Sequence, residues 1–253
     1  MIDMHTHILP GVDDGAETLE DSLRLARAAV EDGIHTVFAT PHHANGKYTN
    51  PAADISPRVR ALNDALLRAN IPLTVLPGQE IRLTSRFFED WESGVLQTLH
   101  DSSYILLEFP SGHIPSEADS VIYELTLLGL QPIIAHPERN AVIASEPDRL
   151  RQLIEKGAVA QVTSHSLNGS FGSKIQQISL QLCRRQLVHF VSTDAHHWQA
   201  RGFDLSKAYT LIERELGSGE VDYYMSNAAC IVSGSPIPIR EPISPRKKWY
   251  QIW

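Results

Sequence analysis

Side chains of the types that bind metal ions lie at the ends of one apolar, strand-like segment after another. Six of the seven predicted strands carry such a residue at or near the carboxyl end: His5, His7, His42, Glu80, Glu108, His136, Asp194 and His196. In a parallel barrel these ends converge on one face, where active sites are built. Nitrogen and oxygen ligands without thiolate suit manganese, iron or zinc. The pattern therefore predicts a cluster of divalent ions, whose usual chemistry is hydrolysis by an activated water.

The first and last of these segments have the spacing that chelation requires. His5 and His7 are residues i and i+2 of a predicted strand, so both imidazoles point to one face, roughly 6.5–7 Å apart at the Cα atoms. Asp194 and His196 repeat this spacing near the other end of the chain. Alternation puts His197 on the opposite face, so we favour His196 over His197 as the ligand.

The second predicted strand offers two adjacent histidines. The strand covers Thr36–Thr40 and is stopped by Pro41, which directly precedes His42 and His43. Because proline interrupts the regular alternation, the local pattern leaves the choice between these two histidines open.

The elements that must position these residues alternate along the whole chain. Predicted strands cover Ile2–His7, Thr36–Thr40, Leu73–Leu76 with Gln79–Leu83, Tyr104–Phe109, Gln131–Ala135, Val159–Thr163 and Leu187–Thr193. Predicted helices cover Thr18–Glu31, Pro51–Ala69, Ser85–Glu92, Ser116–Leu128, Glu146–Lys156, Gly172–Arg185 and Leu205–Leu216. Such alternation is typical of βαβ units around a parallel sheet. We predict the α/β class and a distorted TIM-like barrel of about seven β/α units, the size at which one domain uses ~250 residues.

The rhythm breaks near the carboxyl terminus. Ser235-Pro236-Ile237-Pro238 is incompatible with a regular helix or a central strand. The last residues, Arg246–Trp253, are basic and aromatic. We therefore place the barrel domain at residues 1–235 and a tail at 236–253. A loosely held tail is the simpler interpretation, and a docking or oligomer contact is the alternative.

Composition restricts the class of protein. The 253 residues include 22 basic and 30 acidic ones, a net charge of −8, which argues against a nucleic-acid binder. The chain has no signal-peptide pattern at its start and no apolar run near the ~20 residues that cross a bilayer. Its two cysteines have no disulfide-framework spacing. We expect a cytoplasmic protein with no direct membrane insertion.

The cysteines also fail as nucleophiles. Tyrosine phosphatases that use cysteine need an arginine six positions after it. His189 stands at that position after Cys183, and Pro236 stands there after Cys230. Neither cysteine is therefore the nucleophile of such an enzyme.

Several longer motifs carry a family resemblance. They are Met1-Ile2-Asp3-Met4-His5-Thr6-His7, Val12-Asp13-Asp14-Gly15, Thr40-Pro41-His42, Gly78-Gln79-Glu80-Ile81, Leu106-Leu107-Glu108-Phe109, Pro132-Ile133-Ile134-Ala135-His136-Pro137-Glu138-Arg139 and Ser192-Thr193-Asp194-Ala195-His196. In order and spacing, residues 1–235 resemble the PHP (polymerase and histidinol phosphatase) superfamily. Within it, the chain is similar to the bacterial protein-tyrosine phosphatases found with capsular and exopolysaccharide biosynthesis genes.

The resemblance implies a PHP-type barrel that holds three divalent ions, with manganese preferred and iron or zinc as alternatives. By this resemblance one ion is held by His5, His7, Glu80 and Asp194. Glu80 bridges to a second ion held by Glu108 and His136, and Asp14, His42 and His196 hold the third. Arg139 and Arg201 match the arginines that contact phosphate in the family.

The implied activity is hydrolysis of phosphotyrosine on a protein, such as a cognate bacterial tyrosine kinase, by a hydroxide that bridges the metals. The two arginines suit this activity, since a guanidinium fork donates two parallel hydrogen bonds to a phosphate. The leaving phenolate has a pKa of ~10 and needs little protonation.

Two other enzymes remain as alternatives. The first is a small-molecule phosphatase of the same superfamily, acting on histidinol phosphate or a similar compound. The second is an amidohydrolase-type barrel, which also opens with His-x-His. That barrel leaves Asp14 and the bridging role of Glu80 unexplained, and it expects a histidine at the end of Val159–Thr163, where none occurs.

Overall fold

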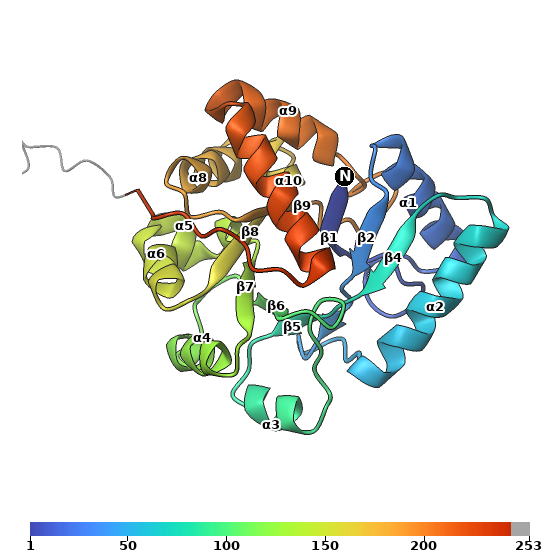
Figure 1. The fold of residues 1–253 in the computed structure, drawn as a ribbon, viewed down its shortest axis with the longest axis horizontal. Helices are drawn as coiled ribbons and strands as arrows, with labels where there is room; N and C mark the ends of the chain where they lie inside the picture. Colours follow the sequence, from blue (N-terminus) through green and yellow to red (C-terminus); the bar gives the residue numbers. More distant parts are fainter. Residues whose placement is uncertain (244–253) are drawn as a thin grey trace, which may run out of the picture.

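Parallel strands form the centre of the protein, which we describe from a computed structural model over residues 1–243. The strands are β1 (Ile2–Thr6), β2 (Thr36–Ala39), β3 (His42–His43), β4 (Thr74–Pro77), β5 (Glu80–Arg82), β6 (Tyr104–Glu108), β7 (Gln131–Ala135), β8 (Val159–Thr163) and β9 (Phe190–Ser192). They pair in the orders β1-β2-β4 and β3-β5-β6-β7-β8-β9. Because β3 continues β2 and β5 continues β4, they occupy seven positions around a barrel (Figure 1).

The barrel closes between its first and last strands. Thr6 forms a parallel bridge with Ala195, beyond the end of β9. The backbone N–H of His7 donates to the Ala195 carbonyl at 2.8 Å, and that of Asp194 donates to the His5 carbonyl at 2.9 Å. These bonds place both predicted chelating pairs side by side, and they complete the predicted seven-stranded α/β barrel.

The second and third predicted strands are each interrupted shortly before a residue of a kind that binds metal ions. Pro41 separates β2 from β3. Gly78 precedes β5, and a Cβ atom there would lie 2.6 Å from Leu99 Cδ2, so only glycine fits without a shift. The strand predicted as Leu73–Leu76 with Gln79–Leu83 is thus broken at Gly78. Beyond the two breaks His42 pairs in register with Glu80.

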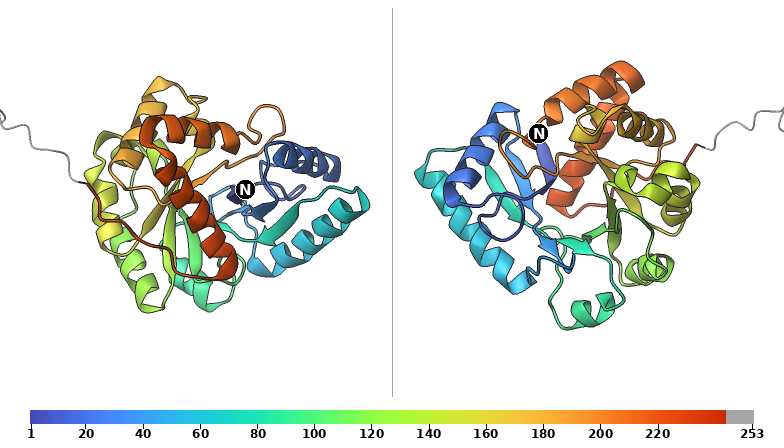
Figure 2. Two further views of the ribbon diagram at one scale, coloured as in Figure 1. Left: turned by 45° about the horizontal axis from the view of Figure 1, so that its top comes forward. Right: turned by 180° about the vertical axis from the view of Figure 1, so that it is seen from behind.

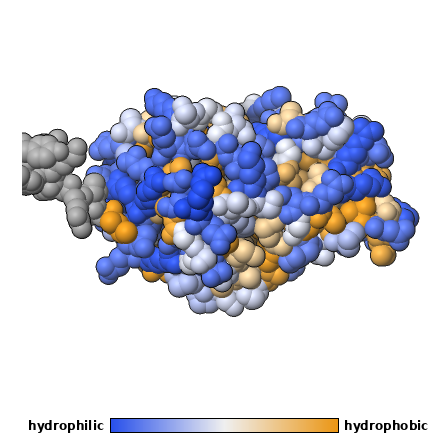
Figure 3. Space-filling model, turned by 90° about the horizontal axis from the view of Figure 1, so that it is seen from above, coloured by the Kyte–Doolittle hydropathy of each residue, from blue (hydrophilic) through white to orange (hydrophobic). Residues whose placement is uncertain are grey.

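Helices surround the barrel (Figure 1), and the face of the molecule seen in Figure 3 is largely hydrophilic with hydrophobic areas between. They are α1 (Leu19–Glu31), α2 (Ala52–Arg68), α3 (Phe87–Glu92), α4 (Ala118–Leu127), α6 (Asp148–Glu155), α8 (Ser173–Arg184) and α9 (Leu205–Leu216), each within or close to its predicted range. In residues 1–243, no helix is long and apolar enough to cross a membrane.

Three short helical segments follow β7 and β8 and were not predicted. They are the 3-10 helix η1 (Pro137–Arg139), α5 (Ala141–Ser145) and α7 (Ser164–Leu167). Side chains cap two of them: Asn140 accepts from Val142 and Ile143, and Thr163 accepts from Ser166. Segments of three to five residues are too short to show a helical period, which explains why the sequence pattern misses them.

The last strand is shorter than predicted. The structure begins β9 at Phe190, whereas the pattern began it at Leu187. Gln186 has φ +55°, and the Leu187 N–H donates to the Leu182 carbonyl, so Leu187 belongs to the turn that ends α8. A buried turn residue cannot be distinguished from a strand residue by hydropathy alone.

An unpredicted helix, α10 (Ser218–Ser233), contacts β1 and β9 and crosses in front of the barrel in Figure 1. Ile231 and Ile237 join the buried interior cluster that includes Met4, Phe38 and Phe190. These contacts close one end of the barrel. The other end carries the carboxyl ends of the strands and can be followed from behind in Figure 2.

Residues 235–243 also pack on the barrel. The Tyr104 hydroxyl donates to the Ser235 carbonyl at 2.7 Å, and the Tyr223 hydroxyl donates to the Pro238 carbonyl at 3.0 Å. The Ile243 N–H donates to the Arg185 carbonyl at 2.9 Å. The first part of the predicted tail is therefore held in place, while its basic and aromatic end, Arg246–Trp253, lies outside the described residues.

Candidate metal centre and active site

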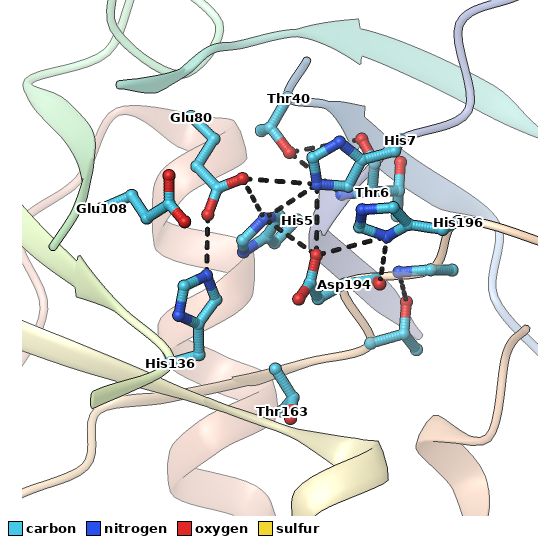
Figure 4. Close-up of polar contacts among 12 residues, drawn as sticks. His5, Thr6, His7, Thr40, Glu80, Glu108, His136, Thr163, Asp194 and His196 are labelled. Atoms are coloured by element: carbon cyan, nitrogen blue, oxygen red, sulfur yellow. Dashed lines mark hydrogen bonds and ion pairs between the residues drawn. The ribbon is translucent and has the colours of Figure 1, made fainter. Parts of the chain in front are cut away.

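Four buried side chains meet where β1 ends beside the residues that follow β9 (Figure 4). His5 Nε2 lies 3.4 Å from Glu80 Oε2 and 3.3 Å from Asp194 Oδ1. His7 Nε2 lies 3.4 Å and 3.1 Å from the same two oxygens. All four side chains are at most 1% exposed. Two imidazole nitrogens and two carboxylate oxygens thus face one small volume, as the i, i+2 spacing predicted.

A second group shares His7 and lies closer to solvent. It contains Asp14, His42 and His196 together with His7. Asp14 Oδ1 lies 3.4 Å from His42 Nε2 and 3.4 Å from His196 Nε2. The His7 ring centroid is 3.8 Å from that of His196 and 4.5 Å from that of His42. His7 therefore stands between the two groups.

Glu80 is the centre of the third group. Its Oε2 lies 2.7 Å from His42 Nδ1, and Glu108 Oε2 lies 3.8 Å from the same nitrogen. On the other side Glu80 Oε1 lies 2.7 Å from His136 Nε2. His42 thus takes part in two groups, whereas His136 reaches the centre through Glu80.

The structure separates the alternatives that the sequence left open or weighed. His42 faces the cluster, and the neighbouring His43 turns its Nδ1 to the Asn50 carbonyl at 2.9 Å. His196 lies in the second group, while His197 is exposed. Each adjacent pair therefore contributes one side chain to the centre.

The donor set fits divalent ions, because buried lone pairs converge there without partners. Within residues 1–243, His42 Nδ1, Glu80 Oε2 and Asp194 Oδ1 are buried and have no hydrogen bond. His42 Nδ1 and Glu80 Oε2 are close but lack the alignment of a hydrogen bond. Unpaired polar atoms of this kind are costly in a protein interior. Cations held by the ligand groups described above would satisfy these atoms.

The electrostatic field of the centre favours cations. Burial acts to lower the pKa of His42, but the Glu80 carboxylate outweighs it, and the pKa of His42 rises to about 10. Burial likewise opposes protonation of His7, yet the Asp13 carboxylate raises its pKa well above the usual value. Burial would raise the pKa of Asp194, but nearby cationic groups, His5 first among them, hold it well below the usual range. Protons and divalent cations therefore compete for the same imidazoles.

Two residues of the centre have left-handed backbones. His136 has φ +33° and Asp194 has φ +58°. Such angles are uncommon for residues other than glycine and are often found at functional sites, where surrounding contacts hold the strain. His136 directly follows β7 and Asp194 lies two residues beyond β9, and both side chains point into the centre (Figure 4).

Both predicted phosphate-binding arginines meet at Asp194. Arg139 Nη2 donates to Asp194 Oδ2 at 2.7 Å, and Arg201 Nη2 donates to the same oxygen. Arg201 Nη1 also lies 3.4 Å from His196 Nε2. Together with Asp14, both arginines line a cavity of about 260 Å³ next to the candidate metal ligands. We call this cavity the catalytic pocket.

Three polar residues that support the ligands were not predicted. Asp13 has a fully buried side chain whose Oδ2 accepts from His7 Nδ1 at 2.7 Å and from the His42 backbone N–H at 3.1 Å. Gln161 Oε1 lies 3.1 Å from His5 Nδ1. Arg82 Nε donates to Glu108 Oε2 at 2.9 Å. Residues that orient ligands in this way are part of a metal site.

The sequence held a signal for two of the three. Gln161 is a lone polar residue in the apolar strand Val159–Thr163, where a buried amide needs a partner. Asp13 stands beside Asp14, and only one of the two was considered as a ligand. For Arg82 we find no comparable signal.

The described geometry can be compared with known proteins. The family model for capsular polysaccharide synthesis, CpsB/CapC, matches residues 1–233. The chain belongs to the CpsB/CapC family. The tyrosine-protein phosphatase YwqE of Bacillus subtilis is 45% identical to it over 98% of this chain and 97% of the relative.

The chain also matches a solved structure from a study of YwqE and related proteins, which are described there as unique metal-dependent tyrosine phosphatases. The TM-score is 0.94 and the identity 44%, over 98% of this chain and all of that one. A histidinol phosphate phosphatase from Lactococcus lactis matches with a TM-score of 0.54 and 15% identity, over 85% of this chain and 93% of that one. The first likeness supports the CpsB/CapC assignment. The second shows only that the two proteins share the TIM-like barrel.

Proposed function

We propose that this member of the CpsB/CapC family is a metal-dependent phosphatase that removes phosphate from tyrosine residues of a protein. The observation that carries the proposal is the meeting of two arginines, Arg139 and Arg201, at the rim of a buried histidine and carboxylate centre. The relative YwqE, at 45% identity, is named a tyrosine-protein phosphatase. Such a pocket suits a phosphate dianion and the charge that develops in phosphoryl transfer.

We assign the metals to three positions. His5, His7, Glu80 and Asp194 would hold the first, with Glu80 shared toward a second held with Glu108 and His136. Asp14, His42 and His196 would hold the third. The 2.7 Å contacts of Glu80 with both His42 and His136 support its bridging role. Manganese is the preferred metal, with iron or zinc as alternatives that the same ligands accept.

When bound, divalent ions lower the pKa of a coordinated water toward ~7 and neutralise phosphoryl oxygens. The chain's own residues do the rest. Arg139 and Arg201 bind the outer phosphate oxygens, and Asp194 holds both guanidinium groups in place before substrate arrives. Burial and Arg139 lower the pKa of His136 to about 4, so this imidazole stays neutral, the form in which it can act as a ligand.

The walls of the catalytic pocket suit an aromatic phosphate ester. Its lining includes Phe109 and Pro137 as well as the polar Ser111 and Asn140. A phenyl ring would pack against the two apolar side chains while its phosphate meets the arginines. The phenolate leaves without strong protonation, since its conjugate acid has a pKa of ~10. We infer that the substrate is a tyrosine-phosphorylated protein in the cytoplasm, such as a bacterial tyrosine kinase that controls polysaccharide synthesis.

The proposal is tested by comparing three substrates at saturating manganese: a phosphotyrosine peptide, a matched phosphoserine peptide and histidinol phosphate. We expect the phosphotyrosine peptide to have the highest kcat/KM. Equal or faster turnover of histidinol phosphate would contradict the proposal and would indicate a small-molecule substrate. His136→Ala should abolish turnover with the circular dichroism spectrum unchanged, and retained turnover would contradict the metal assignment.

A further inference from the structure

A second hollow adjoins the catalytic pocket. It lies between the start of α1 and the segment that follows β9, and it has a volume of about 220 Å³. Asp14 and His196 line both cavities, so the two share a wall. No step of the proposed reaction uses the second hollow, which we call the flanking hollow.

The flanking hollow has an apolar floor and an aromatic wall. Leu25 is 1% exposed and Ala16 is 2% exposed, so the floor belongs to the packed core. Trp198 forms the wall, and its ring is held from two directions. His197 stacks on it at 5.8 Å with an interplanar angle of 24°, and the Arg24 guanidinium lies 5.4 Å from its centroid. A long side chain would therefore meet a fixed surface.

Carboxylates set the charge of the flanking hollow. Glu17 and Asp21 line it. Asp21 is fixed by the capping box of α1, in which Thr18 Oγ1 donates to its Oδ2 at 2.6 Å. Within residues 1–243, Glu17 makes no ion pair. The Arg24 guanidinium beside Trp198 is partnered by Glu20 at 3.4 Å. The hollow is therefore acidic, beside a pocket built for an anion.

We propose that the flanking hollow is a specificity subsite that takes a lysine or arginine side chain close in sequence to the phosphotyrosine. The inference rests on the proposed function. In an extended polypeptide, side chains two positions apart point the same way, roughly 6.5–7 Å apart. Adjoining cavities that share a wall suit such a pair. The aliphatic stem would pack on Leu25 and the edge of Trp198, and the cation would meet Glu17 and Asp21.

The test uses phosphotyrosine peptides of otherwise uncharged sequence, with lysine or glutamate placed in turn at each of the two positions on either side. The readout is kcat/KM for phosphate release at saturating manganese. At one position we expect lysine to exceed glutamate by about threefold or more, since each exposed ion pair contributes a few-fold at most. The preference should shrink as salt concentration rises.

Charge-matched variants locate the effect. Glu17→Lys should abolish or reverse the lysine preference. Glu31→Lys makes the same charge change on an exposed side chain at the far end of α1, outside the hollow, and it should keep both the preference and the basal activity. Trp198→Ala should reduce the preference through the lost wall.

Four outcomes bear against the proposal in different ways. Equal rates for lysine and glutamate at every position would overturn the subsite, as would a preference that Glu17→Lys leaves intact. Loss of the preference in Glu31→Lys as well would assign it to the general surface field, which also overturns the subsite. Failure to hydrolyse any phosphotyrosine peptide would refute the proposed function itself. Free phosphotyrosine, which has no flanking residue, separates these cases, because its turnover depends only on the catalytic pocket.

Discussion

Asp13→Asn is the substitution that most directly tests how the metal centre is organised. The Asp13 carboxylate accepts three hydrogen bonds: from His7 Nδ1 at 2.7 Å, from the His42 backbone N–H at 3.1 Å and from the Gly15 N–H at 3.0 Å. A carboxylate satisfies all three donors at once. It also fixes the proton of His7 on Nδ1, so the Nε2 lone pair faces the centre.

Asparagine has the same shape but only one acceptor oxygen. In either orientation its amide NH₂ must face at least one of the three donors. If the NH₂ faces His7, the imidazole proton moves to Nε2, and the lone pair that should meet the metal is lost. Loss of an orienting carboxylate of this kind typically weakens metal affinity by about 10- to 100-fold, or about 1.4–2.8 kcal/mol.

The assay is titration of manganese into the chelator-stripped protein, followed by calorimetry and by the rise in unfolding temperature. We expect the metal midpoint of Asp13→Asn to shift upward by about one to two decades, with much of kcat recovered at saturating metal. Asp54→Asn makes the same change on an exposed residue of α2 and should leave the midpoint unchanged. An unchanged midpoint in a folded Asp13→Asn protein would refute our account of His7.

Three further predictions concern separate parts of the molecule. Burial lowers the pKa of His189 to about 4, so stability that is complete above pH ~6.5 should fall as the pH drops toward 4. The expected loss in the free energy of unfolding between pH ~6.5 and pH 4 is about 3 kcal/mol. His189→Asn keeps an acceptor for the Ala160 N–H and should lessen this loss, as measured by denaturant titrations at those two pH values. Arg139→Lys loses the guanidinium fork and should lower kcat/KM by about tenfold or more, measured at saturating metal; a smaller change would contradict its contact with phosphate. Ile231→Ala should reduce the free energy of unfolding by about 2–4 kcal/mol in urea while the manganese midpoint stays the same, because this side chain closes the opposite end of the barrel.

Much of the fold follows from local patterns. Apolar strands that alternate with amphipathic helices predicted the parallel barrel, and the observed helices lie within or close to their predicted ranges. The exceptions have local causes. The helices α5 and α7 are too short to show a period. The helix α10 has a weakly periodic sequence, and the positions of its apolar residues are explained only by their contacts with the barrel interior.

The sequence by itself determined which residue types stand at the strand ends, and the i, i+2 rule paired His5 with His7 because strand geometry is local. The tertiary structure alone decided that His7 serves two groups, that His42 rather than its neighbour faces Glu80, and that the Asp13 carboxylate ties His7 to the His42 backbone. The physical reason is the closure of the barrel. The bridge between Thr6 and Ala195 joins segments that are far apart in the chain. Contacts between such distant segments leave no periodic pattern in the sequence from which they could be predicted.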